Sequence, residues 1–160
     1  MVALTDGTAT VDDIVWARCT QSGPLGCNWL APEAQEAEQR GRCLSDSLIR
    51  REPDPDDTIA REKLVPTAVA LRRLVYQLED LGLPIDPYWR TDGGLAFDLL
   101  SSYSAGERIT IGHANGLITI DLVESLDAYR ESLRVRLGEP YRTMLGHLRH
   151  EVGHYYQNIL

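Results

Sequence analysis

The sequence predicts an α+β fold in which about three helices pack on a small antiparallel sheet. Apolar residues recur at helical spacing over residues 67–81, 124–137 and 140–160. Between the first two of these segments, β-rich runs flank the Asn115-Gly116 pair, which is the strongest short-range signal for a β-hairpin. Together, the two patterns place the main core in residues 58–160.

Composition narrows the classes of function. The chain has 160 residues, of which 43% are hydrophobic and 25% charged, as expected for one main domain. Its formal net charge of -8 argues against a general nucleic-acid or anionic-membrane surface, because such surfaces need clustered Lys and Arg. No apolar run approaches the length of a membrane span, and the first residues lack a signal-peptide pattern. We therefore expect a cytoplasmic protein with no nucleic-acid or membrane partner.

The N-terminal part, residues 1–50, carries three cysteines. Residues 1–15 have no sustained periodicity, which indicates an extended or loosely ordered arm. Cys19, Cys27 and Cys43 are an odd number without a secretory signal, so reduced thiols are expected rather than a disulfide framework. Trp16 and Trp29 are expected to cover them. The two prolines and four acids of residues 51–57 then indicate a linker.

The first core helix follows the linker. Thr58 is a candidate N-terminal cap of this helix. Pro66 should kink or interrupt the helix further along. Residues 67–81 present a wide apolar face that ends at Gly82, which is typical of a packing helix.

Three strands are predicted next, over residues 95–100, 108–113 and 117–122. The last two form the hairpin around Asn115-Gly116. His113 ends the first hairpin strand, where it either approaches a metal site or is an ordinary hydrogen-bonded hairpin residue. The helix over 124–137 ends at Gly138, and Pro140 suits the first turn of the last helix.

The last helix contains His150-Glu151-x-x-His154, a metal-site pattern. At about 100° per residue its apolar positions form one stripe, which should face the core. The residues of the stripe are Tyr141, Leu145, Leu148, Val152, Tyr155 and Ile159. His147, His150 and His154 fall on the other side of the helical wheel, and this predicts a histidine face.

Two imidazoles one helical turn apart can both reach a single Zn²⁺, so His150 and His154 are candidate ligands. Glu151 points past the ion, where it can take a proton from a water activated by the metal. The Cα atom of His147 lies about 10.5 Å along the helix axis from that of His154. We therefore expect His147 to contact one of the metal-binding residues or the substrate rather than to bind the zinc ion itself. The alternative is that these are solvated helix histidines.

The residues around this motif also carry a resemblance. Gly138-Glu-Pro-Tyr-Arg-Thr-Met-Leu-Gly-His-Leu-Arg-His-Glu-Val-Gly-His-Tyr-Tyr156 resembles the core signature of a bacterial family of zinc-binding metallopeptidases with a zinc-ribbon-like N-terminal part. Gly26-Cys-Asn-Trp-Leu30, Arg73-Leu-Val-Tyr76, Gly94-Leu-Ala-Phe-Asp98 and Gly112-His-Ala-Asn-Gly-Leu-Ile-Thr-Ile120 resemble further segments in the same order. The resemblance implies a zincin-like core over 58–160 that hydrolyses peptides or proteins with a catalytic zinc ion.

The resemblance also implies a degenerate zinc-ribbon-like knuckle in the N-terminal part. Cys19 and Cys27 would form one half of it. Cys43-Leu-Ser-Asp46 stands where the family pattern would have Cys-x-x-Cys. A second, structural zinc ion is expected only if Asp46 can replace the fourth thiol, and the alternative is three buried or free cysteines.

The chain departs from the resemblance at its C-terminus. A catalytic zinc site normally takes three protein ligands, and in glutamate-type zincins the third comes from a downstream helix. Here six residues follow His154, so the chain resembles an N-terminal portion of the family, with an incomplete peptidase core. The alternative function is therefore a non-catalytic metal-binding or protein-interaction module. Self-association through the C-terminal helix is a further expectation.

Two tyrosines complete the set of candidate residues. Tyr155 or Tyr156 could stabilise an oxyanion in a peptidase site, but Tyr155 also belongs to the apolar stripe.

Overall fold

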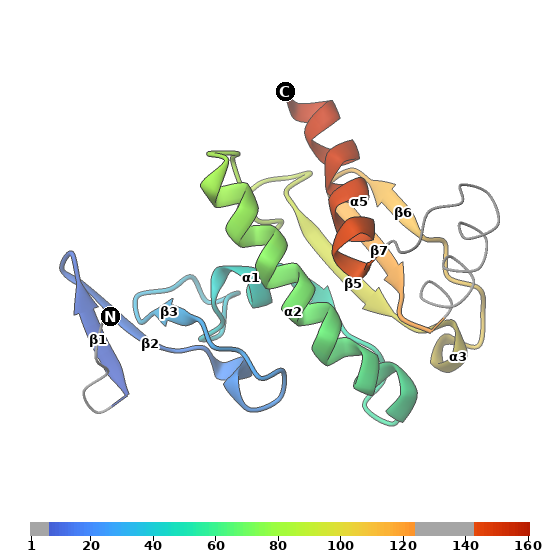
Figure 1. Ribbon diagram of the computed structural model, residues 1–160, viewed down its shortest axis with the longest axis horizontal. Helices are drawn as coiled ribbons and strands as arrows, with labels where there is room; N and C mark the ends of the chain where they lie inside the picture. The colour runs from blue at the N-terminus through green and yellow to red at the C-terminus, as the bar shows by residue number, and fades with distance from the viewer. Residues whose placement is uncertain (1–6, 124–142) are drawn as a thin grey trace. The chain divides into compact units, whose positions relative to one another are not determined.

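The computed structural model describes residues 7–123 and 143–160, and the chain divides into two compact units that meet between Ser47 and Leu48 (Figure 1). The predicted helix over 124–137 and the proposed helix start at Pro140 lie outside the described residues. No described helix is both long and apolar enough to cross a membrane.

The first unit is built on a three-stranded antiparallel sheet in the order β1-β2-β3. Its strands are β1 (Thr8–Val11), β2 (Ile14–Arg18) and β3 (Leu30–Pro32). Of the two alternatives expected for residues 1–15, an extended or a loosely ordered arm, the described part is extended, since it forms β1 and the start of β2. Asp12 and Asp13 make the turn at φ 51° and 62°, a conformation that Asp tolerates better than most residues. A short 3-10 helix, η1 (Thr20–Ser22), and the short helix α1 (Leu44–Ser47) complete the unit.

The second unit contains a four-stranded sheet in the order β4-β5-β7-β6. These strands are β4 (Ile49–Arg51), β5 (Ala96–Leu100), β6 (Gly112–Ala114) and β7 (Leu117–Asp121). The hairpin of β6 and β7 is antiparallel, as predicted, whereas β4 and β7 each pair with β5 in parallel. The α+β class is confirmed, and the parallel pairs make the sheet mixed.

One strand prediction needs correction in detail, and one strand was not predicted. The strand expected over 108–113 is reduced to Gly112–Ala114, since only these three residues have partners in β7. Strand β4 was not predicted, because Arg50 and Arg51 gave it no apolar alternation. The Arg50 guanidinium instead forms a two-pronged ion pair with Asp98 of β5, at 2.6 and 2.9 Å. The segment predicted as a linker over 51–57 thus begins inside the sheet.

Three helices are described in the second unit: α2 (Thr58–Asp80), α3 (Ser102–Ala105) and α5 (Met144–Ile159). Helix α2 runs through Pro66 without a break, so an interruption there is wrong. Its cap is Asp57 rather than Thr58, because the Asp57 side chain accepts a hydrogen bond from the Ala60 N–H at 3.0 Å.

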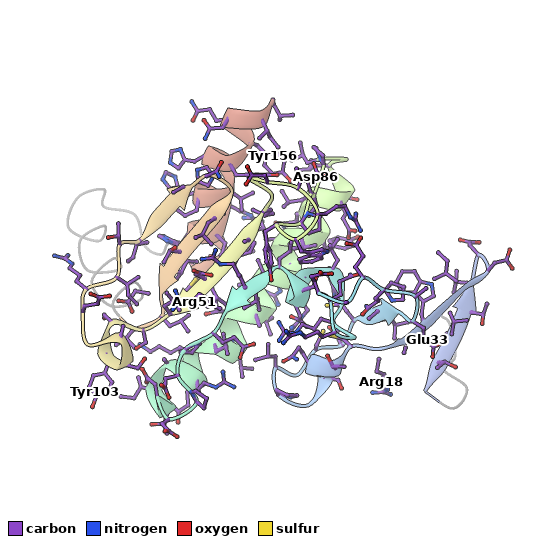
Figure 2. The ribbon with its side chains drawn as sticks, turned by 180° about the vertical axis from the view of Figure 1, so that it is seen from behind. Arg18, Glu33, Arg51, Asp86, Tyr103 and Tyr156 are labelled. Carbon is purple, nitrogen blue, oxygen red and sulfur yellow. The ribbon has the colours of Figure 1, made fainter. Side chains whose placement is uncertain are left out.

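Helices α2 and α5 lie on the same face of the four-stranded sheet, as both views show (Figures 1 and 2). Apolar side chains from both helices and from the sheet are almost fully buried between them. They include Leu64, Leu71, Leu74 and Val75 of α2, Phe97, Leu99, Ile118 and Ile120 of the sheet, and Leu148 and Val152 of α5. This packing determines which side of α5 remains accessible.

Tyr156 joins α5 to the loop after α2. Its hydroxyl donates a hydrogen bond to the Pro84 carbonyl at 2.8 Å, and only 7% of the residue is exposed. Burial raises the pKa of Tyr156 to about 12, with smaller contributions from Tyr155 and from Asp86, which is labelled beside it in Figure 2.

Replacing Tyr156 with Phe should lower the free energy of unfolding by about 1 kcal/mol, because it leaves the Pro84 carbonyl without this donor. Urea denaturation should give a lower midpoint with an unchanged slope. Tyr76→Phe is the matched control, since Tyr76 is 63% exposed on α2. Equal midpoints for the two variants would contradict the assigned role of the hydroxyl.

The hairpin turn should not accept a side chain at Gly116. This residue has φ +82°, and a Cβ would lie 2.0 Å from the Gly93 carbonyl oxygen. Gly116→Ala should therefore cost more than about 2 kcal/mol of stability. Gly153→Ala on α5 is the opposite control: no described atom lies within 4 Å of its added Cβ, and it should gain about 0.5–1 kcal/mol. Thermal unfolding of both variants tests the pair.

Candidate functional site

The histidine motif lies on α5, which begins with a side-chain cap. Thr143 accepts a hydrogen bond from the Gly146 N–H at 3.2 Å. From there the helix buries Leu148, Val152 and Tyr155 against the core. His150 and His154 lie one turn apart on its exposed side, as the helical period predicts.

The two imidazoles are already close to a ligand geometry. The Nε2 atoms of His150 and His154 are 3.2 Å apart, and their rings are nearly perpendicular. Two nitrogens bound at 2.0–2.1 Å to one tetrahedral ion would be separated by about 3.3 Å. The pair therefore fits a single zinc-like ion. Among the described residues, no third His, Cys, Asp or Glu joins these two in a metal-binding group.

His147 and Glu151 are on the same helix but are not exposed. They are 7% and 8% accessible, and the His147 Nε2 lies 3.9 Å from the Glu151 Oε1. Of the three histidines predicted to share one polar face of the helix, His147 is therefore buried. The buried surface of α5 is therefore wider than its apolar stripe, because it also includes His147 and Glu151.

His113 lies on β6, beside α5. Its Nε2 accepts a hydrogen bond from the Gly116 N–H at 3.1 Å, and its ring stands edge-to-face with Tyr155 at 6.1 Å. These contacts are those of a hydrogen-bonded hairpin histidine. Tyr155 is itself 3% exposed, and the Tyr156 hydroxyl already bonds Pro84.

A shallow hollow of about 460 Å³ lies at the C-terminal end of α5. Polar groups of His113 and Asn158 line it together with Asp92. Neither Asp92 nor Asn158 was among the predicted site residues, because neither belongs to a recognisable motif.

The first unit brings together the four residues of the predicted knuckle, which we call the cysteine–aspartate cluster: Cys19, Cys27, Cys43 and Asp46. All four are buried, and their Sγ and carboxylate oxygen atoms lie within 4.8 Å of one another, so the cluster could hold a metal ion. Trp29 packs against the three sulfurs, as predicted. Trp16 instead lines a separate apolar hollow, together with Trp29 and Ile14.

The thiols of the cluster differ in acidity. Hydrogen bonding from Cys43 lowers the pKa of Cys19 to about 6, despite burial. Burial raises the pKa of Cys27 to about 12. Hydrogen bonding to Cys19, together with burial, also raises the pKa of Cys43. Among the three thiols, Cys19 is therefore the one that loses its proton first.

Comparison with known proteins supplies the family. The family model described as "Putative zinc-binding metallo-peptidase" matches residues 61–160. Uncharacterized proteins of Mycobacterium bovis and of two strains of Mycobacterium tuberculosis are each 45% identical to the chain over 150 residues. The alignment covers 91% of this chain but 41% of each relative, so the chain spans about two fifths of their length. No solved structure matches. The chain belongs to the family described as putative zinc-binding metallopeptidases.

Proposed function

We propose that this chain carries the metal-binding helix of a zinc-dependent peptidase. The observation that supports it best is the 3.2 Å separation of the His150 and His154 Nε2 atoms on the accessible side of α5. Bound zinc would supply Lewis acidity that lowers the pKa of a water at the site towards about 7. The family description, with its reference to zinc, agrees with this assignment.

Glu151 is the proposed general base. It follows His150 directly, so its carboxylate projects from the same turn but towards the protein. A carboxylate beside such a water can accept its proton while the oxygen attacks a peptide carbonyl. We also propose that His147, whose Nε2 lies 3.9 Å from the Glu151 Oε1, helps to position the Glu151 side chain.

The edge of the sheet offers a place for the substrate. Strand β6 is the last strand in the order β4-β5-β7-β6, and it lies next to α5. An extended peptide can add to such an edge through main-chain hydrogen bonds. Its scissile bond would then run past the histidine side of α5. We accordingly propose a peptide or protein substrate in an extended conformation.

The second candidate function is a non-catalytic metal-binding or interaction module. It is favoured by one observation, that the described residues provide two histidines and no third ligand beside them. A catalytic zinc ion normally has three protein ligands. Both candidate functions predict metal binding, but only the peptidase predicts peptide hydrolysis. Activity and metal content must therefore be measured on the same samples.

Replacing His150 or His154 with Ala should remove one zinc ion per chain, because each substitution leaves a single imidazole at the site. Elemental analysis of protein purified without a histidine tag measures the loss. Gln157→Ala is the matched control, since Gln157 is exposed on the same helix, carries no imidazole and should leave the zinc content unchanged. Zinc content that is insensitive to both histidines would exclude the site.

Glu151→Gln should lower hydrolysis of a fluorescent casein by about 10²- to 10⁴-fold while zinc content stays the same, since the amide keeps the shape but cannot accept the proton. Glu79→Gln, an exposed position on α2, is the control and should retain full activity. Wild-type chain that binds zinc at α5 but hydrolyses nothing would refute the peptidase function for this chain and favour the non-catalytic module.

A further inference from the structure

We propose that the cysteine–aspartate cluster binds one tetrahedrally coordinated divalent ion of the zinc class, with the Asp46 carboxylate as its fourth ligand. This site is independent of the histidines on α5, because all four residues belong to the first unit. Four protein ligands leave no open position for water, so the site would be structural rather than catalytic.

The distances within the cluster support a common ion. The Sγ atoms of Cys27 and Cys43 are 3.7 Å apart. Two sulfurs that each lie about 2.3 Å from a tetrahedral zinc ion would be separated by about 3.8 Å. The Asp46 Oδ2 is 3.3 Å from the Cys19 Sγ and 3.4 Å from the Cys43 Sγ. A sulfur and a carboxylate oxygen on the same ion would be about 3.6 Å apart.

The backbone supports the charged form of every sulfur. Cys19 Sγ accepts from the N–H groups of Gln21 and Cys43, at 3.5 and 3.2 Å. Cys27 Sγ accepts from the N–H of Trp29 at 3.5 Å, and Cys43 Sγ accepts from that of Asp46 at 3.5 Å. Such donors stabilise thiolates, which are the form that binds metal.

Burial makes a cation the natural partner of these groups. Cys19, Cys43 and Asp46 are at most 1% exposed, and Cys27 is 6% exposed. Three thiolates and a carboxylate would carry four negative charges into a region shielded from water, which is costly unless a cation binds among them. Zinc prefers sulfur ligands and accepts a carboxylate oxygen. A mixed sulfur and oxygen site of this kind therefore suits Zn²⁺ or its spectroscopic substitute Co²⁺.

The ion would connect segments that are distant in sequence. Cys19 follows β2, Cys27 lies in the loop before β3, and Cys43 and Asp46 lie at α1. Cys19 and Asp46 are 27 positions apart. With a small core, the first unit gains stability from a cross-link between three such segments.

The test is a Co²⁺ titration of the full-length chain carrying both His150→Ala and His154→Ala, kept reduced and freed of metal beforehand. We expect one Co²⁺ per chain, with the sulfur-to-cobalt charge-transfer band and the visible bands of a tetrahedral site. Zn²⁺ should then displace the cobalt. A chain that binds no Co²⁺, or binds it without the sulfur band, overturns the proposal whether or not the α5 site exists.

Asp46 is tested in the same double-alanine background. Asp46→Asn should weaken Co²⁺ binding by about 10- to 100-fold or more, because it removes an anionic ligand. Asp46→Cys should restore tight binding and strengthen the sulfur band. Asp54→Asn, an exposed acid, is the control and should bind like the parent. Parent-like affinity and spectrum for Asp46→Asn would show that the carboxylate is not a ligand, as would an unchanged sulfur band for Asp46→Cys.

Discussion

The packing of α5 against α2 and the four-stranded sheet is the constraint on which the candidate peptidase site depends. Leu148 and Val152 are almost fully buried in that interface. Because a helix is rigid, fixing this face also fixes the direction of His150 and His154 on the opposite side. The Tyr156 hydroxyl and the Arg149 guanidinium, which bonds Gln77 of α2, add polar contacts that limit rotation of the helix. The geometry of the histidine pair is therefore a consequence of core packing.

The two candidate metal sites are built in different ways. The histidine pair comes from one helical turn, so its ligand atoms are brought together by local backbone hydrogen bonds. The cysteine–aspartate cluster comes from three segments, and its geometry depends on the fold of the whole first unit. A site of the first kind forms whenever its helix forms. A site of the second kind both requires the fold and, when metal binds, stabilises it.

Sequence patterns predicted the helices and strands that depend on interactions between residues close together in the chain. The Asn115-Gly116 hairpin, strand β5 and the helix after Thr67 all appear, because turn chemistry and periodicity act over a few residues. Strands β1, β2 and β4 carried no comparable pattern. Arg50 reads as a surface residue in sequence, yet its ion pair with the buried Asp98 helps to place β4 at the edge of the sheet. Pairing between distant segments decided these cases.

The sequence by itself determined the fold class, the identity of the histidine pair and the exposure of His150 and His154. These follow from residue identity and helical period, which are properties of short segments. Only the tertiary structure decided that His147 and Glu151 are buried side by side, that His113 packs on Tyr155, and that Asp46 meets three sulfurs. Such contacts depend on how elements far apart in the chain close on one another, and no pattern within a single element specifies that closure.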